Sequence, residues 1–181
     1  MVAEHGAELK PSGSSSWEAL RSPLAADWKS SVLPILEHFI DRTPGSFVEE
    51  KQYSLVWHYR LADTEFGTWL ANELVSMLEA MLAETELRAF HGANIVEVKP
   101  VWASKGEAFE RLHAIQPQAD FLFAIGDDRT DEDLFEHMPE GAWTVHVGPG
   151  ITRASLVTAD FESVRRLLEA LVEVGETLSE T

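Results

Sequence analysis

A run of acidic residues directly after a short apolar segment carries the strongest chemical signal in this sequence. The apolar segment Phe-Leu-Phe-Ala-Ile at 121–125 is followed by Gly-Asp-Asp-Arg-Thr-Asp-Glu-Asp at 126–133. An apolar run of this length is typical of a buried parallel strand, and ligands of open α/β sheets bind at the carboxyl ends of such strands. Carboxylates together with phosphate oxygens are the ligands that Mg²⁺ prefers. The run therefore predicts a metal-assisted phosphate site.

The same acidic run also has a purely structural interpretation. Carboxylates in the first turn of a helix bind its free N–H groups and stabilise the positive end of its dipole. Residues 127–133 are therefore equally consistent with an ordinary helix start. The run alone does not separate the two interpretations.

The composition indicates a globular protein without cysteine chemistry. The chain has 181 residues, of which 45% are hydrophobic, and this is enough for one domain or for a domain with a small insertion. The absence of cysteine excludes disulfides and thiolate metal sites. No apolar stretch of about 18 residues is present, and the start at Met1 shows neither a basic segment nor an apolar signal core. We therefore expect a cytoplasmic protein.

The charge is strongly acidic and restricts the possible partners. Fourteen Lys and Arg residues against 31 Asp and Glu residues give a net charge of −17. Such a field repels nucleic acid and anionic membranes, so we expect neither as a partner. It also repels an anionic substrate, so a phosphate site needs a cation and well-placed basic side chains. A high-salt cytoplasm would screen the self-repulsion.

The hydrophobic periodicity changes several times in the first half of the chain. It predicts helices over 26–42 and 66–85, a strand over 53–59 with a hairpin partner at 47–51, and short strands at 87–91 and 95–99. Pro34 marks a start or a kink of the first helix, and residues 10–16 are expected to form a surface loop. Strands and helix together predict a compact α+β unit.

After Pro100 helices and strands alternate. The pattern predicts helices over 105–115, 131–138 and 161–174 and strands over 121–125 and 143–147. This alternation is typical of parallel βα units. The predicted fold is an α/β core of residues 1–43 and 102–181, with a cap domain of residues 44–101 inserted in it.

Five separated blocks together resemble one family. They are PGSFVEEK at 44–51, SLVWHYR at 54–60, VEVKP at 96–100, Lys105-Gly106 and GDDRTDED at 126–133. In combination and at this spacing they resemble trehalose-6-phosphate phosphatase and the phosphatase-like C-terminal region of trehalose-6-phosphate synthases, both in the haloacid dehalogenase superfamily. The resemblance runs from about residue 2 to residue 172. It implies an α/β haloacid-dehalogenase-like Rossmannoid core, incomplete at its N-terminus, with a small α+β cap.

The resemblance implies hydrolysis of trehalose 6-phosphate to trehalose and phosphate through an aspartyl-phosphate, with Mg²⁺ as cofactor. It assigns Lys105 to the phosphate and Asp127 to the metal as its direct ligand, so that both are catalytic. Asp128 and Asp131 are expected to hold the metal or its waters. Lys105 at the head of a helix would add backbone N–H groups to the same anion site.

Four residues of the cap are implied to contact the sugar. Glu49 and Lys51 lie two apart in a strand and hence on one face, Arg60 could meet them across the hairpin, and Glu97 lies in the second hairpin. Carboxylates accept hydrogen bonds from sugar hydroxyls, and cations donate them. The structural alternative is cross-strand ion pairing on a sheet surface.

The family's nucleophile motif, Asp-x-Asp-Gly-Thr, does not occur in residues 1–181. The nearest likeness, residues 63–68, falls between a cap strand and a cap helix, so we reject it. Residues 2–6 match an interior point of the family's phosphatase domain, and we therefore expect a fragment or a truncated product. Such a chain, lacking the central first strand, is expected to fold poorly or to be inactive alone.

Other functions remain open at this stage. The chain could be a noncatalytic, phosphatase-like regulatory domain of a trehalose-6-phosphate synthase, a phosphatase for another sugar phosphate, or an acidic-pocket receiver module. The expected partners are a small sugar phosphate and a glucosyltransferase (synthase) domain or the missing N-terminal segment. We assign no function to His5 and His58.

Overall fold

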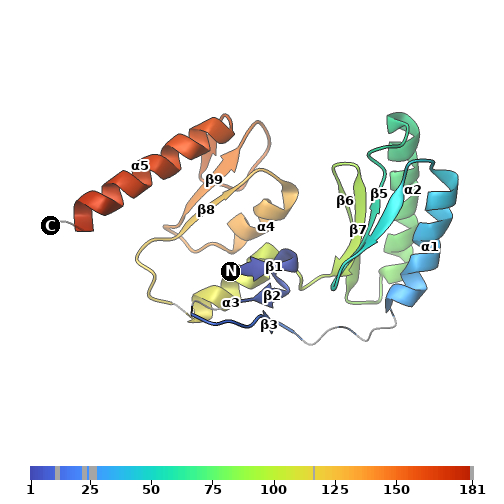
Figure 1. Cartoon of the computed structure of the whole chain (residues 1–181), viewed down its shortest axis with the longest axis horizontal. Helices are drawn as coiled ribbons and strands as arrows, with labels where there is room; N and C mark the ends of the chain where they lie inside the picture. The colour runs from blue at the N-terminus through green and yellow to red at the C-terminus, as the bar shows by residue number, and fades with distance from the viewer. Residues whose placement is uncertain (11–12, 22–23, 25–27, 116, 180–181) are drawn as a thin grey trace. The chain divides into compact units, whose positions relative to one another are not determined.

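The computed structural model describes residues 1–10, 13–21, 24, 28–115 and 117–179, and it divides into two compact units (Figure 1). The first unit is Met1–Ala103 and the second is Ser104–Thr181. The first unit contains β1 (Val2–Ala3), the 3₁₀ turn η1 (Glu4–Gly6), β2 (Glu8–Leu9), β3 (Glu18–Ala19), α1 (Trp28–Arg42), β4 (Phe47–Glu50), β5 (Leu55–His58), α2 (Thr64–Leu82), β6 (Leu87–Gly92) and β7 (Ile95–Pro100). The second contains α3 (Lys105–Ile115), β8 (Phe123–Gly126), α4 (Arg129–His137), β9 (Trp143–Val147), β10 (Leu156–Thr158) and α5 (Phe161–Ser179).

An antiparallel sheet of four strands, in the order β4-β5-β7-β6, is the centre of the first unit. Alternate residues of β5 and β7 face α1 and α2 and are fully buried with them, because the side chains of a strand point alternately to its two faces. The members of this core are Val32, Leu36, Phe39, Leu55, Trp57, Tyr59, Leu70, Ala71, Leu74, Leu78, Leu82, Leu87, Val96 and Val98. The sheet therefore has one apolar face under two helices and one opposite face free for polar residues.

The helix α2 confirms the predicted helical spacing and fixes its start. Its buried residues recur every three or four positions, and Asp63 caps it by accepting a hydrogen bond from the N–H of Phe66 at 2.9 Å. The side chain of Asp63 is thus used in a helix cap, in agreement with its rejection as a nucleophile. The helix ends at Leu82, three residues earlier than predicted.

The helix α1 packs on the same sheet as α2. Its buried residues Val32, Leu36 and Phe39 belong to the core of the four-stranded sheet. Pro34 lies inside the helix, and residues 26 and 27 of the predicted helix lie outside the described residues. The apolar stripe of α1 thus joins residues 28–42 to the predicted cap of 44–101, and the predicted division into core and cap stays a prediction.

The start of the chain forms a small antiparallel sheet, β1-β2-β3. Leu9 in β2 is opposite both Val2 in β1 and Glu18 in β3. The strand β3 was not predicted, because two residues are too few to show a periodicity. Of the predicted loop at 10–16, residues 11 and 12 lie outside the described residues.

The second unit is built on a parallel sheet in the order β10-β9-β8. The predicted parallel alternation is confirmed for β8 and β9, which pair from Phe123↔Trp143 to Gly126↔His146. The strand β10 was missed, because it has only three residues and they are largely exposed. In a parallel sheet the carboxyl ends of all strands lie at one edge, so β8 and β9 both end where α4 begins. Within the described residues, no helix combines the length and apolarity that a membrane span needs.

Candidate functional site

The turn between β8 and α4 is held by a reciprocal pair of aspartates. The Asp128 side chain accepts hydrogen bonds from the backbone N–H groups of Thr130 (2.7 Å) and Asp131 (3.0 Å). The Asp131 side chain accepts in return from the N–H of Asp128 (3.2 Å) and that of Asp127 (3.0 Å). This capping box explains why α4 begins at Arg129, two residues before the predicted start.

Gly126 allows Asp131 to lie against the end of β8. A Cβ atom built at position 126 would be 2.0 Å from Cγ of Asp131, far inside any van der Waals contact. Only glycine therefore permits the carboxylate of Asp131 to fold back over the strand. Glycine at position 126 is thus required by the close approach of Asp131, independently of any function of the aspartates that follow it.

Lys105 meets this turn from the start of α3. Its Nζ donates to Oδ1 of Asp131 at 2.6 Å and lies 3.9 Å from Oδ1 of Asp128. The N–H of Gly106 donates to Oδ2 of Asp133 at 2.9 Å, which joins the first turn of α3 to α4. The structure therefore brings together the lysine and two of the three aspartates that the sequence singled out.

The aspartates differ in exposure and in their partners. Asp131 is only 5% exposed, and its carboxylate is occupied by Lys105 and by two backbone N–H groups. Burial alone would raise the pKa of Asp128, but the Thr130 hydroxyl, the Lys105 ammonium and the N–H groups of Asp131 and Thr130 outweigh it and lower that pKa. Asp127 is exposed, and within the described residues its carboxylate has no hydrogen bond or ion pair. The carboxylate of Asp127 and Oδ2 of Asp128 are thus the groups of this turn that can face a cation.

The donor set suits a cation that keeps most of its ligands outside the protein. Among the described residues no group of three His, Cys, Asp or Glu side chains is arranged to hold a metal ion. Mg²⁺, however, is typically held by one or two carboxylates and completed by waters and phosphate oxygens. Asp127 and Asp128 fit that pattern, whereas Asp131 positions Lys105 and the turn.

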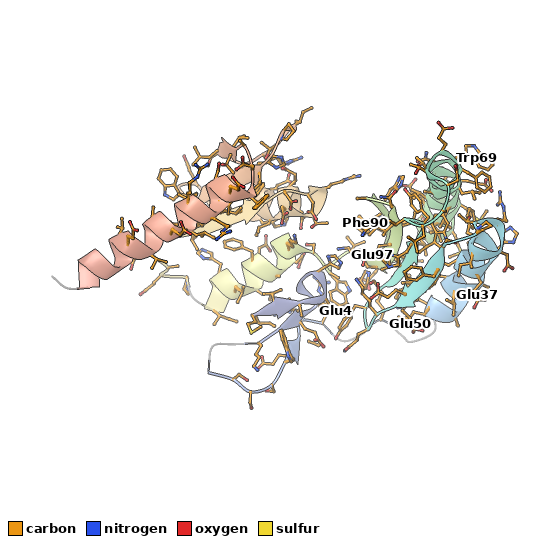
Figure 2. The ribbon with its side chains drawn as sticks, turned by 45° about the horizontal axis from the view of Figure 1, so that its top comes forward. Glu4, Glu37, Glu50, Trp69, Phe90 and Glu97 are labelled. Atoms are coloured by element: carbon orange, nitrogen blue, oxygen red, sulfur yellow. The ribbon has the colours of Figure 1, made fainter. Side chains whose placement is uncertain are left out.

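The polar face of the four-stranded sheet contains the predicted sugar residues. Residues opposite each other on neighbouring antiparallel strands point to the same face, and Val56 pairs with both Glu49 and Glu97. Phe90 pairs with Glu97 from the other side. Figure 2 shows Phe90 and Glu97 on the side of the sheet turned away from α1 and α2. Glu49 and Glu97 therefore share one face, a placement that the sequence predicted only for Glu49 and Lys51.

Each of the two glutamates on this face is paired with a histidine. Oε2 of Glu49 lies 2.9 Å from Nε2 of His58, and Oε1 of Glu97 lies 3.1 Å from Nε2 of His5. Burial alone would raise the pKa of Glu97, but the hydrogen bond and the charge of His5, together with Ser54 and Lys99, outweigh it and lower that pKa. Both pairs are new, since the sequence assigned no function to either histidine.

Lys51 and Arg60 are less closely tied to this face. Lys51 follows β4 directly, and its backbone N–H donates to the carbonyl of Ser54 at 3.0 Å. Arg60 is exposed in the turn after β5. Their assignment to the sugar stays a prediction, as does the assignment of Glu49 and Glu97.

Comparison with known proteins identifies the family. The family model of the trehalose-phosphatases matches residues 1–161, which is most of the chain. The chain belongs to the trehalose-phosphatase family.

Curated relatives of this trehalose-phosphatase domain are longer proteins. A bifunctional trehalose-6-phosphate synthase/phosphatase of Thermoproteus tenax is 41% identical over 94% of this chain and 23% of its own length. A probable α,α-trehalose-phosphate synthase of Arabidopsis thaliana is 36% identical over 96% of this chain and 22% of its own length. The chain thus spans less than a quarter of the length of these relatives.

Solved structures confirm the predicted fold class. The C-terminal domain of a Candida albicans trehalose-6-phosphate phosphatase is 30% identical, covers 93% of this chain and has a TM-score of 0.84, with 68% of that domain covered. An Aspergillus fumigatus trehalose-6-phosphate phosphatase is 34% identical over 90% of this chain and 65% of its own, with a TM-score of 0.65. The predicted α/β fold class is therefore confirmed.

Proposed function

We propose that this chain supplies the phosphate-binding side and the sugar-binding cap of a phosphatase that hydrolyses trehalose 6-phosphate to trehalose and inorganic phosphate. The observation that carries the proposal is the Lys105–Asp131 pair of 2.6 Å at the carboxyl end of β8. Membership of the trehalose-phosphatase family supports it. A lysine fixed at the start of a helix, at the ligand edge of a parallel sheet, is suited to bind a phosphoryl group.

In this proposal Lys105 binds and orients the phosphoryl group. Its ammonium is held by the buried carboxylate of Asp131, so it keeps one position and can offset charge on the phosphoryl oxygens. Because the group is already oriented before the substrate arrives, little reorganisation is needed in the transition state. Asp131 thus acts through Lys105 and is a positioning residue.

Asp127 and Asp128 are the residues that would hold Mg²⁺. Both are exposed at the end of β8, within the turn that also positions Lys105. A bound Mg²⁺ would supply Lewis-acid stabilisation of the phosphoryl oxygens. The lowered pKa of Asp128 favours an ionised ligand at neutral pH.

The nucleophile of this reaction has to come from outside the 181 residues, since no Asp-x-Asp-Gly-Thr block is present in them. The family's chemistry requires an aspartate oxygen to attack phosphorus while the 6-oxygen of the sugar leaves with a proton from the second aspartate. Water then cleaves the aspartyl-phosphate. Lys105 stays at the phosphoryl group in both steps.

This proposal is tested by restoring the missing motif. A segment of a family member that carries the Asp-x-Asp-Gly-Thr block is joined to this chain, and phosphate release from trehalose 6-phosphate is measured with Mg²⁺ and with EDTA. The chimera should release phosphate only with Mg²⁺. Equal rates with EDTA would contradict the metal assignment, and no release would contradict the proposed function.

The substrate preference is tested on the polar face of the sheet. In the chimera, Glu97→Ala should raise KM for trehalose 6-phosphate about tenfold or more, with little change for p-nitrophenyl phosphate, because only the first substrate has a sugar to read. Glu37→Ala on α1 serves as a matched control, since Glu37 is exposed on a different element. An equal rise of KM for both substrates would contradict the assignment of Glu97 to sugar recognition.

A noncatalytic domain of a trehalose-6-phosphate synthase is the second candidate. One observation favours it, namely the synthase relative that is 36% identical. A regulatory domain would not need a preformed phosphate site. A chimera that binds trehalose 6-phosphate but never releases phosphate would favour this candidate.

A further inference from the structure

A hydrogen bond between His5 and Glu97 joins two parts of the first unit that are 92 residues apart in the sequence. Nε2 of His5 lies 3.1 Å from Oε1 of Glu97. The two side chains differ in accessibility, because His5 is 27% exposed and Glu97 only 6%. A ligand on this face would therefore reach the imidazole before the carboxylate.

The turn that carries His5 has an unusual backbone. Glu4, His5 and Gly6 have φ angles of +50°, +55° and +99°, so three successive residues are in the left-handed region. Residues other than glycine adopt this region at a cost, and such turns persist where surrounding contacts hold them. One such contact here is the bond of His5 to Glu97, and another is the N–H of Ala7, which donates to the carbonyl of Glu4 at 3.0 Å. Figure 2 shows Glu4 of the same turn on the side of the sheet where Glu97 lies.

The surroundings of Glu97 fix the carboxylate in place. Glu97 is flanked on the sheet by Val56, which is buried, and by Phe90. Lys99, two residues along the strand, is also buried, and its Nζ donates to the carbonyl of Ala103 at 2.8 Å and lies 4.9 Å from the ring centroid of Phe90. A carboxylate held in this way can orient an imidazole but has little freedom to follow a ligand.

From these contacts we infer that His5 is a sugar-binding residue and that Glu97 is its positioning residue. Glu97 accepts a hydrogen bond from Nε2–H and thereby fixes the ring and its tautomer, as second partners of functional histidines commonly do. Nδ1 is then left to accept a hydrogen bond from a sugar hydroxyl. This inference rests on the proposed function, because it refines how Glu97 contributes to sugar recognition.

A purely structural tie is the competing explanation. In that case the pair would only hold the turn of residues 4–6 against β7, and the affinity for trehalose would not depend on it. The two explanations differ in one measurable property, the affinity for the phosphate-free sugar.

The inference is tested by titrating the chimera that carries the Asp-x-Asp-Gly-Thr segment with trehalose and following the imidazole C–H signals by NMR. The His5 signals should shift with a saturable dependence on trehalose, and those of His38, which is exposed on α1, should not. A chimera whose His5 signals do not respond to trehalose overturns the inference, and this measurement requires no substitution.

Substitutions separate binding from folding. His5→Gln retains a donor near the place of Nε2 and should keep the link to Glu97, yet raise the dissociation constant for trehalose about tenfold or more. Glu97→Gln should do the same by releasing the ring, and 15N shifts of His5 should then report a changed tautomer. His38→Gln is the matched control and should leave the dissociation constant unchanged. Unchanged affinity in a folded His5→Gln chain contradicts the inference.

Failure of this inference can be distinguished from failure of the proposed function. A chimera that hydrolyses p-nitrophenyl phosphate with Mg²⁺, combined with a trehalose affinity that is insensitive to His5, would keep the phosphatase and remove the His5–Glu97 pair from the sugar site. A chimera that does not hydrolyse p-nitrophenyl phosphate but whose trehalose affinity depends on His5 would contradict the proposed phosphatase and support the His5–Glu97 pair as part of the sugar site.

Discussion

Asp131 is the residue on which the arrangement at the end of β8 depends. Its two oxygens bind the Lys105 ammonium and the N–H groups of Asp127 and Asp128, while its side chain is almost fully buried. A buried carboxylate with three donors is stabilising only while all of them are satisfied. Asp131 therefore links the helix cap to Lys105, the lysine that we propose binds the phosphoryl group.

Replacing Asp131 by Asn should destabilise the chain and free Lys105. Loss of a charge-assisted hydrogen bond at a buried position costs about 1.5–3 kcal/mol, which urea denaturation would detect. Glu136→Gln is the matched control. Glu136 lies on the same helix, and because its pair with Arg153 is more than half exposed on both sides, its loss should matter by less than about 0.5 kcal/mol. Equal effects of the two substitutions would argue against a special position for Asp131.

Glu97 gives a prediction on pH. Because its pKa is lowered in the folded chain, its ionised form stabilises the fold above the ordinary pKa of 4.5, and this contribution is lost as the pH falls through the folded value. The free energy of unfolding of the parent should therefore exceed that of Glu97→Gln at neutral pH, and the difference should shrink below pH 4.5. A difference that grows on acidification would mean that the carboxylate is not stabilised by His5.

At the scale of elements, the contact between α4 and the end of β8 requires a residue without a side chain. Gly126→Ala should place a methyl group inside Asp131 and cost about 2 kcal/mol or more of stability. Gly175→Ala on α5 meets nothing within 4 Å and should be neutral or stabilise by up to about 1 kcal/mol. Thermal unfolding of both variants decides this, and a harmless Gly126→Ala would contradict the described turn.

The sequence predicted the elements that are long enough to show a hydrophobic periodicity. Helix α2 shows period 3.6, and the strands β5, β6 and β7 show short apolar or alternating runs, because one side of each packs on the core of the first unit. Strands β3 and β10 are too short to carry such a signal. The Lys105–Asp131 contact was foreseeable through the family blocks, whereas the His5–Glu97 contact joins residues 92 positions apart and has no local signature.

The whole molecule carries a net charge of −17, and this predicts a dependence on salt. Self-repulsion lowers the stability of the folded state and is screened by ions. The free energy of unfolding in urea should rise by about 1 kcal/mol or more between roughly 0.1 M and 1 M KCl. NaCl should act in the same way if screening is the cause. A stability that is independent of salt would remove adaptation to a high-salt cytoplasm from consideration.

Whether the end of β8 binds the phosphoryl group is measured by kcat/KM of the chimera with Lys105→Ala. The substitution should lower kcat/KM about 100-fold or more for both trehalose 6-phosphate and p-nitrophenyl phosphate, since both present a phosphoryl group to the same ammonium. Lys29→Ala, on α1 and paired with the exposed Glu50, is the matched control and should change neither. Retention of activity on either substrate by Lys105→Ala would contradict the assignment of the phosphate site.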